Sequence, residues 1–123
     1  MEPVKFVWVA AAGGAGAVTR YAIGLAIGVE RFPWATLLIN ITGSLVFAFV
    51  ITFATERHLS TPLATAITVG FLGAYTTFAT LAWESFVMAH TGRTGTAVLY
   101  IAASLVGGLS AAWAGYEVAR AVR

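Results

Sequence analysis

Four long apolar segments, separated by short polar connections, run through the sequence. They cover residues 4–28, 33–55, 63–89 and 95–118. Each is near or above the roughly 20 residues that a membrane-spanning helix needs. Because the connections are so short, consecutive helices must run antiparallel, and no extramembrane catalytic domain fits between them. The pattern predicts an all-α protein with one four-helix transmembrane domain over residues 1–123.

The third apolar segment contains a stretch that is unusual for a plain membrane helix. Residues 70–84, GFLGAYTTFATLAWE, hold two glycines, three threonines, a tyrosine and a carboxylate. A helix in hydrocarbon opens only where the freed backbone groups find partners in protein or line a watery cavity. We therefore expect an interruption near Gly70, Gly73 and Thr76. Carbonyls freed at such an interruption suit a small hard cation.

Composition excludes several classes of function. The chain is 59% hydrophobic and 10% charged, whereas soluble domains are about 25% charged. Without cysteine it has no disulfide, thiolate nucleophile or cysteine-ligated metal. Its two histidines, His58 and His90, fall near span ends, which gives a histidine metal site little support. There is no phosphate-binding motif, and a net charge of +2 is too small to indicate nucleic acid. We therefore expect that the protein is not an enzyme.

With Arg20 left out because it lies within a span, the basic residues are divided four to two between the two membrane faces. One face carries Lys5, Arg57, Arg120 and Arg123, and the other carries Arg31 and Arg93. Lysine and arginine favour the cytoplasmic side, so this weak bias would place the termini there. Insertion in both orientations produces so weak a bias, but many ordinary small membrane proteins show it too. The chain has no internal repeat, and a second, inverted copy could supply the symmetry that transporters obtain from inverted repeats.

The first segment carries a charge far from its ends, Arg20. The segment looks superficially like a signal peptide, but its apolar pattern continues to Gly28, so we expect a retained span. A guanidinium at this depth costs about 2.5–3.5 kcal/mol on insertion scales and should face protein or water. Two interpretations stay open, a structural staple and an attractor for an anion. Gly24 and Gly28 form a G-x-x-x-G pair typical of close helix packing.

Polar side chains form a stripe on the second segment. Thr36, Asn40, Gly43 and Phe47 share one helix face. The Asn40 amide offers two N–H donors, which is the chemistry that a dehydrated anion needs. The alternative is an asparagine that only joins helices, which contributes roughly 1 kcal/mol.

The third and fourth segments carry matching polar faces. Thr80 and Glu84 share a face with Thr77, and in the fourth segment Tyr100, Ser104 and Gly108 recur every four residues. Together with Asn40, these faces would make a narrow polar track. The alternative for the threonines is a bond back to carbonyls of their own helix. Phe78 is either core packing or a ring whose positive edge faces an anion.

Three motifs resemble those of the Fluc (CrcB) family of fluoride channels. They are GGAGAVTRY at residues 13–21, ATLLINITGS at residues 35–44 and GFLGAYTTFAT at residues 70–80. The resemblance covers nearly the whole chain, and the third motif is the specific one. It implies a passive fluoride-selective channel that exports fluoride from the cytoplasm of a prokaryotic cell through its inner membrane.

The resemblance also implies an assembly and a set of site residues. The assembly is an antiparallel, dual-topology homodimer with two fluoride pores and a central sodium ion on the carbonyls of Gly73 and Thr76. Asn40 and Phe78 would contact fluoride, and Arg20 would attract anions or support the structure. The residues that would line or support the pore are Thr36, Thr77, Thr80, Glu84, Tyr100 and Ser104.

One departure from the family pattern concerns the pore. The family usually has a second phenylalanine three residues after the first, where this chain has Leu81, and leucine has no ring quadrupole. A rival interpretation is a small multidrug-type, proton-coupled cation exporter, which would need a carboxylate in the first segment, where the charge is Arg20. A third is a non-transporting assembly subunit. The polar stripes disfavour it because buried polar groups are costly.

Overall fold

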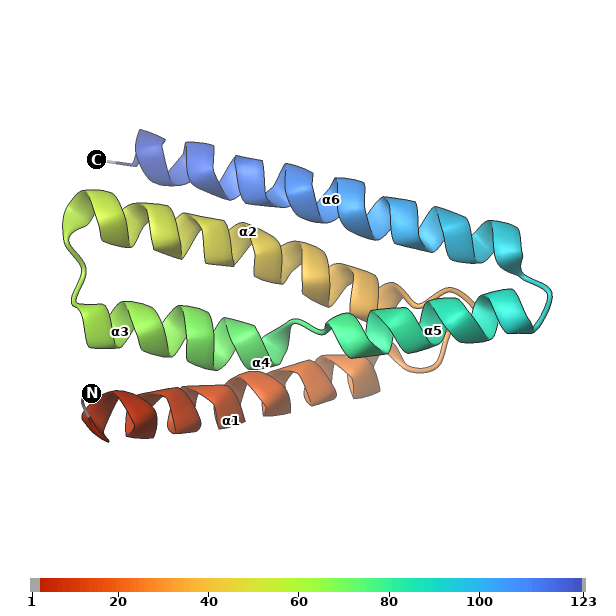
Figure 1. The fold of residues 1–123 in the computed structure, drawn as a ribbon, viewed down its shortest axis with the longest axis horizontal. Coiled ribbons are helices and arrows are strands. Elements are labelled where there is room, and N and C mark those ends of the chain that lie inside the picture. The colour runs from red at the N-terminus through yellow and green to blue at the C-terminus, as the bar shows by residue number, and fades with distance from the viewer. Residues whose placement is uncertain (1–2, 123) are drawn as a thin grey trace.

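The chain is a bundle of long, nearly parallel and antiparallel helices in the computed structural model, which describes residues 3–122 (Figure 1). Helix α1 covers Pro3–Ile27 and α2 covers Trp34–Arg57. The third span consists of α3 (Thr61–Thr65), the π-helix η1 (Ala66–Leu72), α4 (Gly73–Tyr75) and α5 (Phe78–His90), and α6 (Thr94–Ala121) follows. The two termini lie at the same end as the α2–α3 connection. Arg123, counted above among the basic residues, lies outside the described residues.

Four helical segments are long and apolar enough to cross a membrane. They contain 25, 24, 30 and 28 residues, the third of them being the whole stretch Thr61–His90. This confirms an all-α protein with four candidate spans, and the predicted limits differ by one to three residues. Proline marks two of the helix starts, because Pro33 directly precedes α2 and Pro62 lies in the first turn of α3.

Small residues set the contacts between the helices. A β-carbon on Gly16 would collide with the Phe71 carbonyl of η1, and one on Gly115 of α6 would collide with the Leu45 carbonyl of α2. The predicted packing role of Gly24 and Gly28 is not seen, because a β-carbon at either position meets nothing within 4 Å in the described chain. Gly28 has a φ of 79° and ends α1, a conformation that glycine adopts easily.

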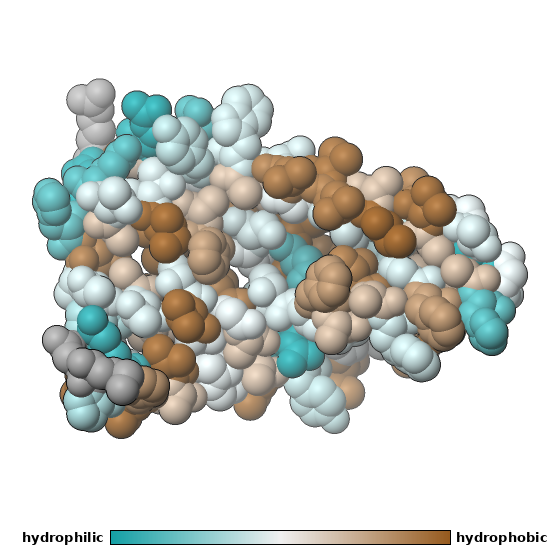
Figure 2. Space-filling model, in the orientation of Figure 1, coloured by the Kyte–Doolittle hydropathy of each residue, from teal (hydrophilic) through white to brown (hydrophobic). Residues whose placement is uncertain are grey.

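Apolar side chains lie mostly outside the bundle. Only 6–22% of each candidate span is buried within the chain, and Figure 2 shows hydrophobic residues along the length with hydrophilic ones gathered mainly at the two ends. Tyr100 is an exception, since it is fully buried in a cluster with Leu37, Met88 and Ala97. The outer surface is suited to lipid or to another protein.

Candidate functional site

The third span is interrupted at Thr76 and Thr77. Both residues are extended, with φ, ψ of −79°, 157° and −147°, 119°, so α4 ends and α5 begins again in mid-span. β-branched residues favour this backbone region. Of the three positions expected for the interruption, Thr76 is confirmed, whereas Gly70 and Gly73 lie before it. Gly70 lies inside η1 against Val9 and Ala12 of α1, and Gly73 has helical torsions.

Thr77 caps the second half-helix. Its Oγ1 accepts a hydrogen bond from the Thr80 N–H (3.3 Å) and donates one to Thr80 Oγ1 (3.1 Å). Thr77 precedes α5 as its N-cap residue, but it lines one cavity with Thr80 and Glu84, so the three side chains do share a face. Because α5 begins directly after Thr77, the positive end of the α5 dipole opens at the interruption, where it favours an anion.

The side-chain amide of Asn40 holds the interruption in place from α2. Its Nδ2 donates to the Thr77 carbonyl (3.0 Å), and its Oδ1 accepts from the Thr77 N–H (2.8 Å). One of the two Asn40 N–H groups that we expected to face an anion is thus committed to protein, and one remains. In a continuous helix the Thr77 N–H would bond to the Gly73 carbonyl, so this contact also takes a donor away from Gly73.

The carbonyls around Gly73 differ in what they contact. The Ala74 carbonyl accepts from Nε of Arg20 (3.1 Å). The Leu72 carbonyl accepts from both the N–H and the hydroxyl of Thr76, at 3.0 and 2.9 Å. The Thr76 hydroxyl is therefore bonded to its own helix, as the alternative for the threonines foresaw. Gly73 itself is exposed in the chain, and its carbonyl has lost its helical donor.

The backbone carbonyl oxygens of Gly73 and Thr76 fit a small monovalent cation better than a transition metal. Sodium in membrane proteins is coordinated by unwound backbone carbonyls and the C-terminal ends of half-helices. Gly73 and Thr76 lie at such an end. In the described residues no cluster of three or more His, Cys, Asp or Glu side chains could hold a metal ion.

A first cavity of about 350 Å³, the arginine cavity, lies between α1, α2 and α5. Its polar lining residues are Arg20, Thr36, Thr77, Thr80 and Glu84, with Glu30 at the end near the α1–α2 connection. Arg20 therefore lines a cavity and also bonds to the Ala74 carbonyl. Its geometry accommodates both a structural staple and an attractor for an anion. A cavity with a guanidinium and hydroxyls in its wall can attract an anion, although Glu84 opposes that charge.

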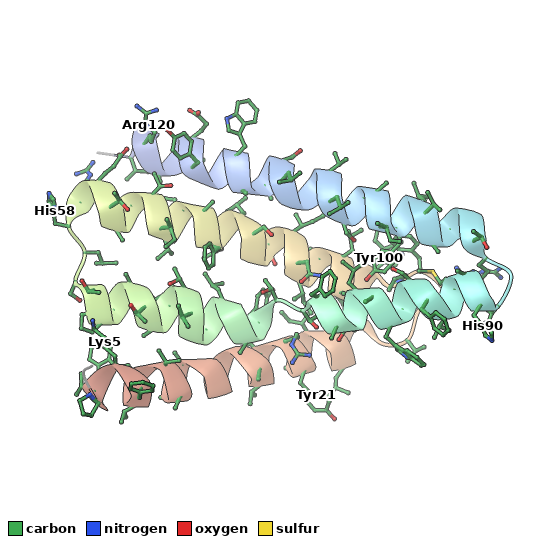
Figure 3. All side chains as sticks on the ribbon, viewed as in Figure 1. Lys5, Tyr21, His58, His90, Tyr100 and Arg120 are labelled. Carbon is green, nitrogen blue, oxygen red and sulfur yellow. The ribbon has the colours of Figure 1, made fainter. Side chains whose placement is uncertain are left out.

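Tyr100 supports this cavity from behind. It points from α6 toward α5 (Figure 3), and its hydroxyl donates to Glu84 Oε1 at 2.9 Å. Tyr100 lines neither of the two cavities described here. Its position is thus a supporting one that fixes the Glu84 carboxylate.

A second cavity of about 430 Å³, the amide cavity, lies on the other side of the Asn40–Thr77 contact. The side chains that matter in its wall are those of Asn40, Phe47, Thr77, Phe78, Leu81 and Ser104. Thr77 lines both cavities, and no charged residue lines this one. The Phe78 side chain is 81% exposed, so one side of the cavity is open in the single chain.

Ser104 is an informative residue in this wall. Within the described residues, its Oγ is the one buried side-chain nitrogen or oxygen without a hydrogen-bond partner. Nearly all buried polar atoms in proteins are satisfied, so an orphaned one indicates a water or ligand. The wall thus brings the amide of Asn40 and the hydroxyl of Ser104 together with the aromatic ring of Phe78.

Phe47 is the residue in this wall to which sequence reasoning gave no role. It lies on the same stripe of α2 as Asn40, so the signal was its spacing of seven residues. Gly108, which shares the Tyr100 and Ser104 face, lies outside the wall, and a β-carbon there would be 3.7 Å from Ser44 Oγ.

Comparison with known proteins decides the family. The family model described as "CrcB-like protein, Camphor Resistance (CrcB)" matches residues 7–116. The chain belongs to the CrcB family. Its curated relatives include "Fluoride-specific ion channel FluC 2" of Geobacillus kaustophilus, which is 47% identical and aligns over 91% of this chain and 90% of the relative.

Two further CrcB relatives cover almost the same region. A "Fluoride-specific ion channel FluC" of Acidobacterium capsulatum is 41% identical over 94% of this chain and 95% of its own. "Fluoride-specific ion channel FluC 1" of Desulfitobacterium hafniense is 40% identical over 88% of this chain and 96% of its own. The resemblance predicted from the three motifs is confirmed.

Proposed function

We propose that this chain forms a passive, fluoride-selective channel that lets fluoride leave the cytoplasm and so limits its toxic accumulation. The observation that carries the proposal is the amide cavity, found in a chain whose relatives are named fluoride-specific ion channels. In acid surroundings fluoride enters cells as uncharged HF and dissociates inside. A passive exit for the anion counters that accumulation without nucleotide.

Selectivity would come from the few groups that replace the hydration shell of fluoride. The remaining N–H of Asn40, the Ser104 hydroxyl and the edge of Phe78 surround a space without charged side chains. Neutral donors can bind an anion without trapping it, which conduction requires. The arginine cavity would be the entrance, with Thr36, Thr80 and Glu84 as its polar lining.

The alternative class, a proton-coupled cation exporter of the small multidrug type, has less support. It needs a carboxylate in the first span, and the charged residues of α1 are Lys5 and Arg20. We also infer that the chain is not an enzyme, since its relatives are named ion channels.

We further propose that the functional unit is an antiparallel homodimer in a prokaryotic inner membrane, with two pores and chains inserted in both orientations. The open side of the amide cavity supports a second copy, since lipid tails offer no hydrogen-bond partners to the polar groups of its wall, and the exposed Phe78 ring lies in that wall. The weak, four-to-two bias of basic residues between the two faces is compatible with dual insertion. Cysteine crosslinks that join only parallel copies would contradict this arrangement.

A sodium ion at the centre of that dimer is part of the proposal. The Gly73 and Thr76 carbonyls of two copies would hold it, and it would neutralise the negative ends of the two first half-helices. Two carbonyls from one chain are too few to enclose a cation, which ties the ion to assembly. Replacing all sodium by N-methylglucamine should weaken the dimer in detergent. An unchanged dimer and unchanged fluoride efflux would contradict the proposed sodium site without affecting the proposed fluoride channel.

The decisive experiment is fluoride efflux from proteoliposomes, followed with an ion-selective electrode and repeated with chloride. We expect rapid fluoride efflux and little chloride efflux. Equal permeation of both anions, or no fluoride efflux from liposomes that contain folded protein, would overturn the proposed function.

A further inference from the structure

The amide cavity has two aromatic residues in its wall, and they come from different helices. Phe78 begins α5 and Phe47 lies in the middle of α2. Leu81 reaches the same cavity from α5, and it packs against the buried cluster of Leu37, Met88 and Tyr100. The α5 wall therefore offers one ring and one aliphatic side chain.

The position of Phe47 relates it directly to Asn40. Seven residues separate the two, so they lie on one face of α2 about 10 Å apart along its axis. An ion that leaves the Asn40 amide along this face passes Gly43 and Ser44 and then reaches the Phe47 ring. The cavity is continuous between them, because both side chains line it.

The ring of Phe47 is not engaged elsewhere in the described chain. It is 43% exposed and takes part in none of the ring pairs of the described residues. The neighbouring Phe49, by contrast, stacks on Phe53 at 5.7 Å between ring centroids with 16° between planes. The Phe47 ring can therefore turn its edge toward the cavity, whereas the Phe49 ring is held against Phe53 of the same helix.

We propose that Phe47 is a pore-lining residue that supplies the second aromatic edge in this chain. The inference rests on the proposed fluoride function and adds a residue to its path. A ring edge carries partial positive charge and can face a dehydrated anion, which Leu81 cannot do. The path then has two aromatic edges in succession, from Phe78 of α5 and Phe47 of α2.

The test compares Phe47→Leu, which removes the ring, with Phe47→Tyr, which keeps it. As a matched control, Phe86→Leu removes a ring that is 56% exposed and lies outside the amide cavity. Fluoride efflux from proteoliposomes should fall by at least roughly fivefold in Phe47→Leu, equivalent to about 1 kcal/mol in the barrier. Phe86→Leu should keep the rate of the unmodified protein, and Phe47→Tyr, which retains the ring, should lose less efflux than Phe47→Leu.

A second variant restores a ring on the opposite wall. Adding Leu81→Phe to Phe47→Leu should recover most of the lost fluoride efflux. Efflux from Phe47→Leu at the unmodified rate, or an equal fall in Phe47→Leu and Phe47→Tyr, would overturn the role of Phe47. If Phe47→Leu does not yield folded protein, Phe47→Met, which keeps the bulk without a ring, replaces it under the same criteria. If the unmodified protein shows no fluoride efflux, that result would instead contradict the proposed function.

Discussion

Asn40 and Thr77 are 37 residues apart in sequence and joined by two hydrogen bonds, so that a side chain of α2 completes the backbone of the third span. The amide replaces part of the helical bonding that the chain loses where α4 ends. It also separates the arginine cavity from the amide cavity, because Thr77 lines both. A single side chain thus stabilises the interruption and faces the proposed ion path.

Replacing Asn40 by aspartate should abolish fluoride efflux. The carboxylate can still accept from the Thr77 N–H, but it opposes the Thr77 carbonyl and brings negative charge into an uncharged wall. Loss of the donor to a buried carbonyl costs about 1–3 kcal/mol. Efflux assays on folded Asn40→Asp protein check this prediction. Fluoride efflux at the rate of the unmodified protein would show that Asn40 does not line the pore.

Variants of Arg20 separate its two interpretations. Arg20→Lys keeps the positive charge in the arginine cavity, whereas Arg20→Gln keeps an N–H donor that can approach the Ala74 carbonyl. If the charge attracts fluoride, Arg20→Lys should retain most of the efflux and Arg20→Gln should lose severalfold, most strongly at low salt. Since both replacements keep an N–H donor for the Ala74 carbonyl, equal efflux from the two variants in the same assay would identify Arg20 as a structural staple alone.

Tyr100→Phe tests the support behind Glu84. The variant keeps the buried ring and removes the hydroxyl that donates to Glu84 Oε1. We expect a loss of about 1 kcal/mol in stability and slower fluoride efflux, because the carboxylate becomes free to move in the entrance. The matched control is Tyr116→Phe, whose exposed hydroxyl accepts from Arg120 at the end of α6. Equal thermal shifts for the two variants in detergent would contradict a special role for Tyr100.

Gly16→Ala tests the close contact of α1 with η1. Its β-carbon would collide with the Phe71 carbonyl, which cannot move without shifting the π-helix, so a destabilisation of about 1–3 kcal/mol is expected. Gly14→Ala is the control, since a β-carbon there meets nothing within 4 Å in the described chain. Thermal unfolding followed by size-exclusion recovery measures both, and similar unfolding temperatures would show that α1 packs elsewhere.

Much of this architecture could be predicted from the sequence, since it depends on local properties. Apolar runs define the spans, and residues 70–84 signal an interruption because glycine and threonine do not suit a lipid-facing helix. The pattern names Thr76 among three candidate positions but does not single out the exact place of the interruption. It lies at Thr76 and Thr77, where Asn40 of another helix supplies the missing hydrogen bonds.

Other features also depend on distant contacts. Gly16 of α1 lies against η1, and Gly70 of η1 lies against α1. A single sequence does not reveal this mutual contact. The G-x-x-x-G pair at Gly24 and Gly28 meets no other helix within the described chain, so its packing role stays a prediction for a second copy. The spacing of Phe47 from Asn40 was visible, but its meaning depended on which cavity the stripe lines.

The orphaned hydroxyl of Ser104 has a thermodynamic consequence. A buried oxygen without a partner is destabilising, and an occupant that hydrogen-bonds to it recovers that free energy. An ion that binds only the folded chain raises the melting temperature as its concentration increases. Fluoride, at concentrations where chloride has no effect, should therefore protect this protein from heat, and Ser104→Ala should show a smaller protection.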